Sequence, residues 1–462
     1  MAGTMRQKPA PPNLELLDFG DDLAILVPPF GAQTACSVPS RPQGQESRAM
    51  QCNASDAIET TERERELALA ARMDRIAKAY AECWLQHGPD PEFGGVHGFL
   101  NRKWQPEPPT DKGLIQQSRH LWTFSTWYER REPSPRIEAI ARNLYQFVIG
   151  KFSDTHGVGF ARKVSRSGAV IDPVHQVYPE SFAVYALATF GRVFREPAAI
   201  ERAVRCFKAF DERAYEPRFG GYDLTGEPPW QTPGANKETN THIHVMEALT
   251  ALASVSDDAL VHQRLREFTE ITLTRLRQPK NYAHLEFLMD YTPFGEPCVS
   301  YGHDLETSWL VLEALRVLET SPVVAPLDRT FAQLALAIGK ASAEWGFDTE
   351  QGGYFNQGIP AEHVVDREKI WWVQFEALPA LVRQHRAGLL ADALHRIERT
   401  LDWIETAQID CEYGGFYWGV LPDGTWGEYG DRKGDPWKAS YHEIRGLLFA
   451  SDWLKGTEPA NA

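Results

Sequence analysis

A glycine-rich turn flanked by aromatic residues recurs along this chain at a nearly constant spacing. The intervals are 64 residues from Gly95 to Gly159, 62 from Gly159 to Gly221 and 62 from Gly353 to Gly415, with a gap of 132 from Gly221 to Gly353. We expect a sixth turn without glycines inside this gap, near residue 287. Such a fixed period is typical of a fold built from repeated units. The five glycine turns are Phe93-Gly94-Gly95, Gly157-Val158-Gly159-Phe160, Phe219-Gly220-Gly221-Tyr222, Gly352-Gly353-Tyr354-Phe355 and Tyr413-Gly414-Gly415-Phe416.

Each interval between turns has room for two helices, and the apolar residues there follow the helical period. The expected helices span residues 64–86, 115–131, 134–150, 176–195, 197–214, 239–254, 258–277, 303–320, 325–345, 367–385, 388–407 and 438–454. Short connections make successive helices antiparallel neighbours. An open solenoid of such hairpins would need polar caps and shorter, more regular repeats, whereas a closed ring buries every apolar face. The sequence therefore predicts an all-α fold, an (α/α)6 barrel of six helical hairpins with short β-hairpins on the active-site face.

The two ends of the chain differ from this repeating region. Residues 1–60 are rich in Pro, Gln and Ser and show no sustained period, so we expect a disordered or loosely attached extension. We expect the catalytic barrel domain to span residues 61–456, followed by a short tail at 457–462.

Charge and cysteine content narrow the partners and the compartment. The chain has 48 Lys and Arg against 63 Asp and Glu, a net charge of −15, without a basic cluster, so nucleic acid and anionic membranes are poor partners. The six cysteines lie far apart without a CxxC pair, which favours reduced thiols over disulfides or a zinc site. The apolar run from Leu23 to Phe30 is too short for a membrane span or a signal peptide. We expect a cytoplasmic protein that is a monomer or a weak homodimer.

The helices that follow the turns begin with unusually polar and aromatic residues. In a closed ring these helix starts would share one face, and the partly positive ends of their dipoles would point into a single funnel. Tryptophans beside polar residues suit the flat faces of sugars, although plain core packing is the alternative. The groups at these starts are Gln116, Arg119, Tyr178, Glu180, Asn240, His242, His244, His303, Glu306, Trp371, Trp372, Glu376, Trp437 and His442.

The segment from Tyr301 to Leu315 carries the first candidate for chemistry. His303 and Glu306 stand three residues apart, on neighbouring rows of one helix. An imidazole beside a carboxylate can transfer protons near neutral pH. The alternative is a capping box in which His303 and Asp304 begin the helix and Glu306 holds backbone N–H groups. We interpret Asp304 itself as a helix N-cap.

The other polar helix starts have structural alternatives. His242 and His244 lie two residues apart and would point to different faces of a helix, so they do not predict a metal site. We interpret His242 as structural, and Trp122 and Trp309 as core residues. For Tyr178 and Trp371 the sequence does not decide between a role in the site and packing in the core.

Five motifs in order resemble the N-acylglucosamine 2-epimerase superfamily, and within it the cellobiose 2-epimerase branch, over about Thr61 to Lys455. The resemblance implies an (α/α)6 barrel, no metal or organic cofactor, and isomerisation at C2 of a reducing-end sugar. The motifs are Lys112-x-x-x-Gln116-x-x-Arg119-x-x-Trp122-x-Phe124, Asn240-Thr-His242-Ile-His244-x-x-Glu247-Ala, Gly302-His303-Asp304-Leu-Glu306-Thr-Ser-Trp309, Lys369-Ile-Trp371-Trp372-Val-Gln374-x-Glu376-Ala and Trp437-Lys438-x-x-Tyr441-His442.

The resemblance also implies roles for individual residues. His303 and His442 match the two catalytic acid/base histidines, and His244 matches a third histidine that helps the sugar ring to open. Arg119 matches the arginine that holds the open-chain carbonyl oxygen. The residues that match its polar companions or the sugar contacts, with Trp371 added as the neighbour of Trp372, are Asn240, Glu306, Tyr178, Trp371, Trp372, Glu376 and Trp437.

Two departures from the branch bear on sugar preference. Phe375 stands where the branch usually has a small residue, and Ala439-Ser440 stands where it usually has Cys-Pro. Neither change touches a residue that matches the acid/base chemistry.

Inversion at C2 of an aldose needs one proton removed and another delivered to the opposite face of the opened sugar. Two histidines on different helices can do this, Arg119 can stabilise the enediolate oxygen, and Glu306 can fix the tautomer of His303. The sequence therefore predicts cofactor-independent C2 epimerisation of a small sugar, cellobiose or a related β-1,4 disaccharide first, through a cis-enediolate.

Three alternatives stay open beside this prediction. The first is a mannose 2-epimerase or an aldose–ketose isomerase that converts mannose or glucose to fructose on the same scaffold. The second is a glycoside hydrolase, which needs two carboxylates flanking the bond, whereas histidines outnumber carboxylates here. The third is a non-catalytic sugar-binding module.

Overall fold

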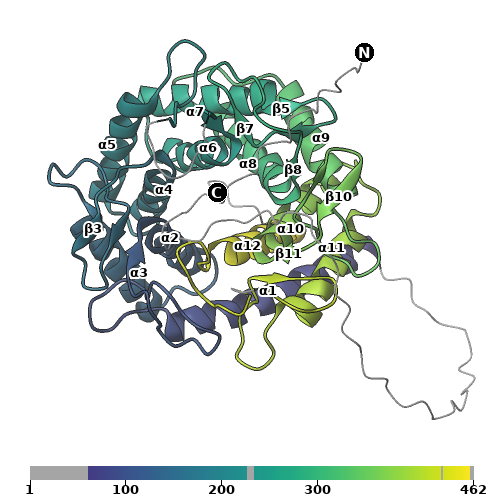
Figure 1. The fold of residues 1–462 in the computed structure, drawn as a ribbon, viewed down its shortest axis with the longest axis horizontal. Helices are drawn as coiled ribbons and strands as arrows, with labels where there is room; N and C mark the ends of the chain where they lie inside the picture. The colour runs from purple at the N-terminus through teal and green to yellow at the C-terminus, as the bar shows by residue number, and fades with distance from the viewer. Residues whose placement is uncertain (1–60, 226–233, 428–429, 458–462) are drawn as a thin grey trace, which may run out of the picture. The chain divides into compact units, whose positions relative to one another are not determined.

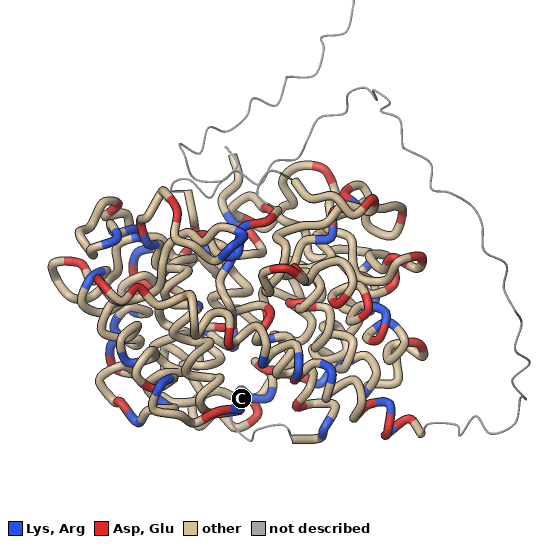
Figure 2. Tube along the Cα trace, turned by 90° about the horizontal axis from the view of Figure 1, so that it is seen from below, with Lys and Arg blue, Asp and Glu red and all other residues tan. Residues whose placement is uncertain are grey.

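The computed structural model describes residues 61–225, 234–427 and 430–457, which belong to one compact unit. The predicted extension, residues 1–60, lies outside the described residues, and so do residues 458–462 of the predicted tail. None of the described helices combines the length and apolar character needed to cross a membrane. Basic and acidic residues alternate around the described part of the chain (Figure 2).

Twelve α-helices in the described residues form two concentric rings, which confirms the predicted barrel (Figure 1). The inner helices are α2 (Leu114–Arg130), α4 (Val177–Val193), α6 (Thr239–Ala253), α8 (Tyr301–Glu319), α10 (Trp371–Arg386) and α12 (Tyr441–Lys455). The outer helices are α1 (Glu62–His87), α3 (Pro135–Phe147), α5 (Pro197–Ala214), α7 (Ala259–Ile271), α9 (Thr330–Trp345) and α11 (Ala393–Trp403). Single π-helical turns extend three of the outer helices, at η1 (Val148–Phe152), η2 (Thr272–Leu276) and η3 (Ile404–Gln408).

The ring is closed by its two chain ends. Each inner helix packs against the next, and α12 packs against α2. Five hairpins join an inner helix to the outer helix that follows it, and the sixth pairs α12 with α1 from the other end of the chain. Arg63 at the start of α1 donates hydrogen bonds to the carbonyls of Leu454 (2.5 Å) and Lys455 (2.9 Å). The inner helices are buried on nearly all sides, as expected for helices surrounded by others.

Short strands lie in the long connections before the inner helices, on the face where those helices begin. They are β1 (Lys112–Gly113), β2 (Lys163–Val164), β3 (Val170–Asp172), β4 (Lys237–Glu238), β5 (Arg277–Gln278), β6 (Tyr282–Ala283), β7 (Glu286–Phe287), β8 (Val299–Ser300), β9 (Gln357–Ile359), β10 (His363–Asp366), β11 (Lys369–Ile370) and β12 (Gly419–Val420). All the pairings among them are antiparallel. Because β11 pairs with β12, α10 begins at Trp371 rather than at the expected residue 367.

One side chain at the start of each inner helix, or just before it in the case of α12, hydrogen-bonds the backbone shortly after the preceding turn. We call these six side chains the anchor residues. They give each inner helix a fixed height and rotation against its own loop, because a buried backbone group must find a partner. The contacts are Gln117 with Val96 N (2.9 Å), Glu180 with Phe160 N (2.9 Å), His242 with Tyr222 N (3.4 Å), Asp304 with Ala283 N (2.9 Å), Gln374 with Tyr354 N (2.7 Å), and Lys438 with Phe416 O (2.6 Å).

The anchor of α8 locates the turn that lacks glycines. The turn lies between β5 and β6, where Lys280 (φ 70°) and Asn281 (φ 56°) take the left-handed conformation that glycine pairs take in other units. The expected position near residue 287 was wrong by a few residues, because residues 286 and 287 form the strand β7. Asn tolerates this conformation better than most residues, so the turn keeps its shape without glycine.

The same contact corrects the interpretation of Asp304. Ser300, not Asp304, is the N-cap of α8, since its hydroxyl accepts a hydrogen bond from His303 N (3.4 Å). Asp304 is fully buried, and it also accepts a hydrogen bond from Ser342 Oγ (2.8 Å). Burial raises the pKa of Asp304 from 3.8 to about 8, so the folded protein keeps this carboxyl neutral at pH 7.

We predict that Asp304 makes the stability of the barrel fall as pH rises. The unfolded chain loses this proton near pH 3.8 and the folded chain keeps it up to about pH 8. The free energy of unfolding therefore decreases across that interval. The variant Asp304→Asn cannot titrate, while its carbonyl oxygen can still accept from Ala283 N and its amide nitrogen can donate to Ser342 Oγ. It should therefore lose this part of the slope in denaturant unfolding. An unchanged pH slope in Asp304→Asn would contradict the assignment.

Candidate active site

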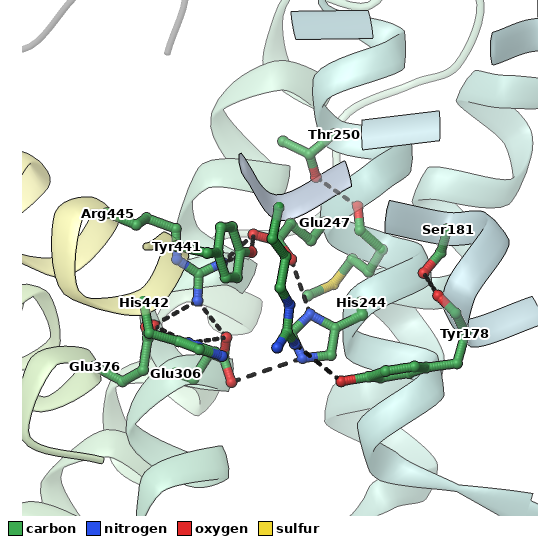
Figure 3. A network of polar contacts seen from close by, with 12 residues as sticks. Tyr178, Ser181, His244, Glu247, Thr250, Glu306, Glu376, Tyr441, His442 and Arg445 are labelled. Atoms are coloured by element: carbon green, nitrogen blue, oxygen red, sulfur yellow. Dashed lines mark hydrogen bonds and ion pairs between the residues drawn. The ribbon is translucent and has the colours of Figure 1, made fainter. Parts of the chain in front are cut away.

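The starts of the inner helices bring the predicted site residues of α6, α8, α10 and α12 together around one centre. Figure 3 shows His244 of α6, Glu306 of α8, Glu376 of α10 and His442 of α12 directed toward one another. All four side chains are buried. The closed ring explains this convergence, because each of these helices begins on the same face.

Arg445 of α12 lies at this centre. Its guanidinium is fully buried and contacts Glu247, Glu306, Glu376 (2.6 Å) and the hydroxyl of Tyr441 (Figure 3). Three carboxylates therefore share one permanent cation. A carboxylate cluster without such a cation would be costly to bury.

Two histidines are oriented by these carboxylates. His244 Nδ1 lies 2.8 Å from Glu247 Oε2, and His442 Nδ1 lies 2.7 Å from Glu376 Oε1. His244 Nε2 lies 3.9 Å from Glu306 Oε2, an oxygen that is buried without a hydrogen-bond partner among the described residues. Because Nδ1 is engaged in both rings, Nε2 is the atom of each imidazole that is left for proton transfer.

His303 and His442 lie against the same indole ring. The ring centroid of Trp372 is 4.8 Å from that of His303 and 5.7 Å from that of His442. This packing needs the glycine before His303, since a Cβ on Gly302 would lie 2.6 Å from the Trp372 ring. The two histidines come from α8 and α12 and pack against one indole.

Arg119 and Tyr178 form the neighbouring wall of the site. Arg119 donates hydrogen bonds to Trp437 O (2.7 Å) and Tyr178 Oη (3.2 Å), and its guanidinium lies over the Phe182 ring. Tyr178 meets His244 edge to face with ring centroids 5.4 Å apart. Burial raises the pKa of Tyr178 to about 12, so its hydroxyl keeps its proton at neutral pH. Asn240 is half-buried and hydrogen-bonded to Tyr178.

Burial favours the neutral forms of the central acids and bases. It lowers the pKa of His303 to about 3, with the charge of His244 adding to the effect, and it lowers the pKa of His442 well below 6.5. Burial also raises the pKa of Glu306 and of Glu376 to about 7. Neutral imidazoles beside carboxyl groups that titrate near pH 7 can accept a proton and pass one on, as general acid–base chemistry requires.

Several predicted roles change in the structure. Glu306 contacts Arg445, so it is not the partner that fixes the tautomer of His303. Trp371 is buried, with its ring 4.6 Å from that of Trp418. Trp309 is more than a core residue, because its Nε1 donates a hydrogen bond to Glu376 (3.1 Å). His242 is structural, as expected, because it is an anchor residue. Phe375 is buried and packs on Phe416 in the core.

The sequence analysis missed the residues that hold the histidines in place. Glu247 follows His244 by three residues, and Arg445 follows His442 by three residues. That spacing places each pair on one helix face and was the available signal. Tyr441 was quoted in a motif without a role, and it contacts both Glu247 and Arg445.

Two groups of described residues have ligand atoms close enough together to hold a cation. One is Glu306, Glu376 and His442, and the other is Glu62, Glu66 and His385, each with ligand atoms within 4.8 Å of one another. In the first group Arg445 already supplies the positive charge that the carboxylates need. His242 and His244 belong to neither group.

A ring of six helical hairpins around buried histidine–carboxylate pairs defines an (α/α)6-barrel protein. The family model for N-acylglucosamine 2-epimerase (GlcNAc 2-epimerase) matches residues 94–443. The chain belongs to this family, as the sequence predicted, and is a carbohydrate epimerase, an enzyme of the isomerase class.

Individual relatives match nearly over their full length. The chain is 28% identical over 373 residues to a cellobiose 2-epimerase of Bacteroides fragilis, covering 78% of this chain and 93% of that protein. The structure of a cellobiose 2-epimerase from Spirochaeta thermophila matches with a TM-score of 0.75 and 28% identity, covering 86% of this chain and 99% of the other. A more distant relative, a D-mannose isomerase of Marinomonas mediterranea, is 20% identical over 384 residues, covering 77% and 90%.

We predict that Gly302→Ala disables the site with a modest effect on stability. The new methyl group would displace Trp372 from its place beside His303 and His442, and a shift of ~1 Å near reacting groups can cost about 10²-fold in rate. Overpacking should cost about 1–3 kcal/mol of unfolding free energy. Enzyme assays and thermal unfolding measure the two effects.

Gly339→Ala is the matched control. A Cβ there would lie 2.5 Å from Ser308 Oγ, a similarly tight contact between α9 and α8 away from the histidines. It should reduce stability and leave turnover close to wild type. A folded Gly302→Ala variant with full activity would show that the Trp372 position is unimportant.

Proposed function

We propose that this enzyme epimerises C2 of a free reducing-end aldose, with cellobiose or a related β-1,4-linked disaccharide as the substrate. The observation that carries the proposal is the contact of His303 and His442 with one indole ring from two different helices. Two neutral imidazoles that pack on one indole from different helices fit a reaction that takes a proton from one face of a carbon and returns one to the other face. The likeness to cellobiose 2-epimerases over most of both chains supports the substrate.

The reaction begins with opening of the sugar ring. The His244–Glu247 pair is suited to this step, because Glu247 fixes Nδ1 and leaves Nε2 to exchange a proton with the anomeric hydroxyl or the ring oxygen. Burial opposes ionisation of Glu247, but Arg445 and His244 outweigh it and hold the pKa at about 2. Glu247 therefore stays ionised and can stabilise a protonated His244.

Proton transfer at C2 follows ring opening. One of His303 and His442 accepts the C2 proton at a ring nitrogen, and the electron pair moves into a cis-enediolate whose oxygen lies against Arg119. The other imidazole delivers a proton to the opposite face of C2 from one ring nitrogen. When this imidazole is His442, the neutral form of Glu376 gives a replacement proton to Nδ1, so that His442 stays neutral. The product is the C2 epimer. The first imidazole is left protonated and Glu376 is left ionised, and proton exchange with solvent restores both.

Half-buried aromatic rings support a disaccharide over a single sugar. Trp372 and Trp437 are both half-buried beside the polar centre, and Trp437 lies 6.3 Å from Tyr178 between ring centroids. Indole faces of this kind can stack on the second sugar ring, while Arg119 and the histidines hold the reducing end.

A second candidate is an aldose–ketose isomerase, favoured by the D-mannose isomerase among the relatives. It would use the same cis-enediolate and return the proton to C1 rather than to C2. The two candidate reactions differ in whether the imidazole acting as the acid delivers its proton to C2 or to C1.

The enzyme is further proposed to be cytoplasmic and to act as a monomer or weak homodimer. Six cysteines without a CxxC pair suit a reducing compartment.

We predict that solvent deuterium appears at C2 of the product when cellobiose is turned over in deuterated water. The C2 proton moves to an imidazole nitrogen, which exchanges with solvent before it is returned. His303→Asn and His442→Asn should each lower turnover by about 10² to 10⁴-fold, the usual worth of general acid–base catalysis. NMR of the product reads out the label, the epimer and the rate.

His385→Asn is the control for histidine substitution. His385 lies near the end of α10 and contacts Glu66, so turnover should not change. Retention of the original C2 hydrogen at full turnover would exclude the mechanism. A ketose as the main product would favour the second candidate.

A further inference from the structure

Arg445 connects the two histidine–glutamate pairs of the site. Its terminal nitrogens contact Glu247, the partner of His244, and Glu376, the partner of His442 (Figure 3). The third carboxylate on the guanidinium, Glu306, reaches toward both histidines, at 3.9 Å from His244 Nε2 and 4.0 Å from His442 Nδ1. Arg445 is thus in contact with one carboxylate beside each of the two histidines and with a third carboxylate between them.

The charges of this cluster do not balance if every carboxylate is ionised. One guanidinium faces three carboxylates, and all four groups are buried. Protons on Glu306, Glu376 or the histidines must remove the excess negative charge, because unpaired buried charges are costly. A proton gained by one pair changes the field at the other, since charges interact strongly in a buried site.

We propose that Arg445 is a positioning residue that sets how many protons the His244–Glu247 and His442–Glu376 pairs hold. It keeps His442 neutral, so that this imidazole can accept a proton from the sugar. It also couples the ring-opening pair to the C2 pair, because both share its charge. The inference rests on the proposed function, and Arg445 acts through the carboxylates without touching the sugar.

The groups around His442 come from every neighbouring element of the barrel. Burial is the largest effect that opposes protonation of His442, and the positive charges of Arg119 and Arg445 add to it. The carboxylates of Glu376 and Glu306, at 2.7 Å and 4.0 Å from Nδ1, are the negative groups beside it. The titratable and charged groups are Tyr80 of α1, Arg119 of α2, Tyr178 and Tyr185 of α4, His244 and Glu247 of α6, His303 and Glu306 of α8, Glu376 of α10, and Tyr441, Glu443 and Arg445 of α12.

Two substitutions should move the pH profile in opposite directions. Arg445→Met removes a positive charge, so His442 binds a proton more tightly and the acidic limb of kcat/KM moves to higher pH. Glu247→Gln removes a negative charge, so the acidic limb moves to lower pH. Each shift should be about one pH unit or more, as expected for charges a few ångströms apart. A role in folding alone gives no reason for shifts of opposite sign.

Arg445→Lys and Arg130→Met are the controls. Lysine keeps the charge but cannot hold three carboxylates, so kcat should fall while the acidic limb stays in place. The side chain of Arg130 is only 8% exposed and pairs with Asp452 near the other end of α2, so its loss should lower stability without moving the acidic limb. If Arg445→Met does not fold, Glu247→Gln and Arg445→Lys still decide the question. The proposal would be overturned if the acidic limb of kcat/KM stayed in place in both Glu247→Gln and Arg445→Met, or if it moved in the same direction in both.

A second measurement separates this proposal from the proposed function. NMR titration of ¹⁵N-labelled histidine in the free wild-type, Arg445→Lys and Glu247→Gln proteins reads the protonation of His244 and His442 without turnover. The pKa of His442 should fall in Glu247→Gln and stay in place in Arg445→Lys. If the protein shows no epimerase activity but the pKa of His442 behaves as expected in the two variants, the proposed function is rejected and the role of Arg445 is kept. If the enzyme is active and the pKa of His442 does not change in Glu247→Gln, the proposed function is kept and the role of Arg445 is rejected.

Discussion

Each inner helix of the barrel is held at its first turns by one side chain that binds the backbone leaving the preceding turn. The six anchor residues differ in chemistry, from glutamine and glutamate to histidine, aspartate and lysine. Five of them accept a hydrogen bond from a backbone N–H, and Lys438 donates one to a backbone carbonyl. Without them the polar helix starts could slide or rotate, because apolar packing alone tolerates several registers. The anchors place six helix starts on one face, and the active site consists of what those starts carry.

A second constraint acts inside this ring, where charged groups lie away from water. The cluster around Arg445 keeps three carboxylates buried beside two histidines because one guanidinium and shared protons limit the net charge. Burial then pushes the histidines toward their neutral forms and two of the glutamates toward titration near pH 7. These are the protonation states that a reversible proton transfer to and from carbon requires. The same buried arrangement that is costly for folding is thus what makes the site reactive.

The fold could be predicted because periodicity and turn spacing are local properties of the chain. The anchor residues could not be predicted. The partner of Asp304, for example, is a backbone group some twenty residues away, and an aspartate at a helix start is normally an N-cap of that helix. The histidines could be found because the helices that follow regularly spaced turns all begin on the same face of the ring, so the polar residues at their starts lie together. Arg445 was missed because it lies one turn inside its helix, where an arginine usually reaches solvent, and only the closed ring brings Glu247, Glu306 and Glu376 to it.

The account depends on His303 and His442 lying on either side of one sugar carbon. A crystal structure with cellobiitol, the open-chain alditol of cellobiose, tests this directly, because the ligand has the chain of the opened substrate and no carbonyl to react. We expect C2 between the two imidazoles, each with a ring nitrogen at about 3–3.5 Å, the separation of a reactive pair. We also expect O1 beside Arg119. A well-ordered ligand with C2 in contact with only one of these histidines, or with neither, would contradict the account.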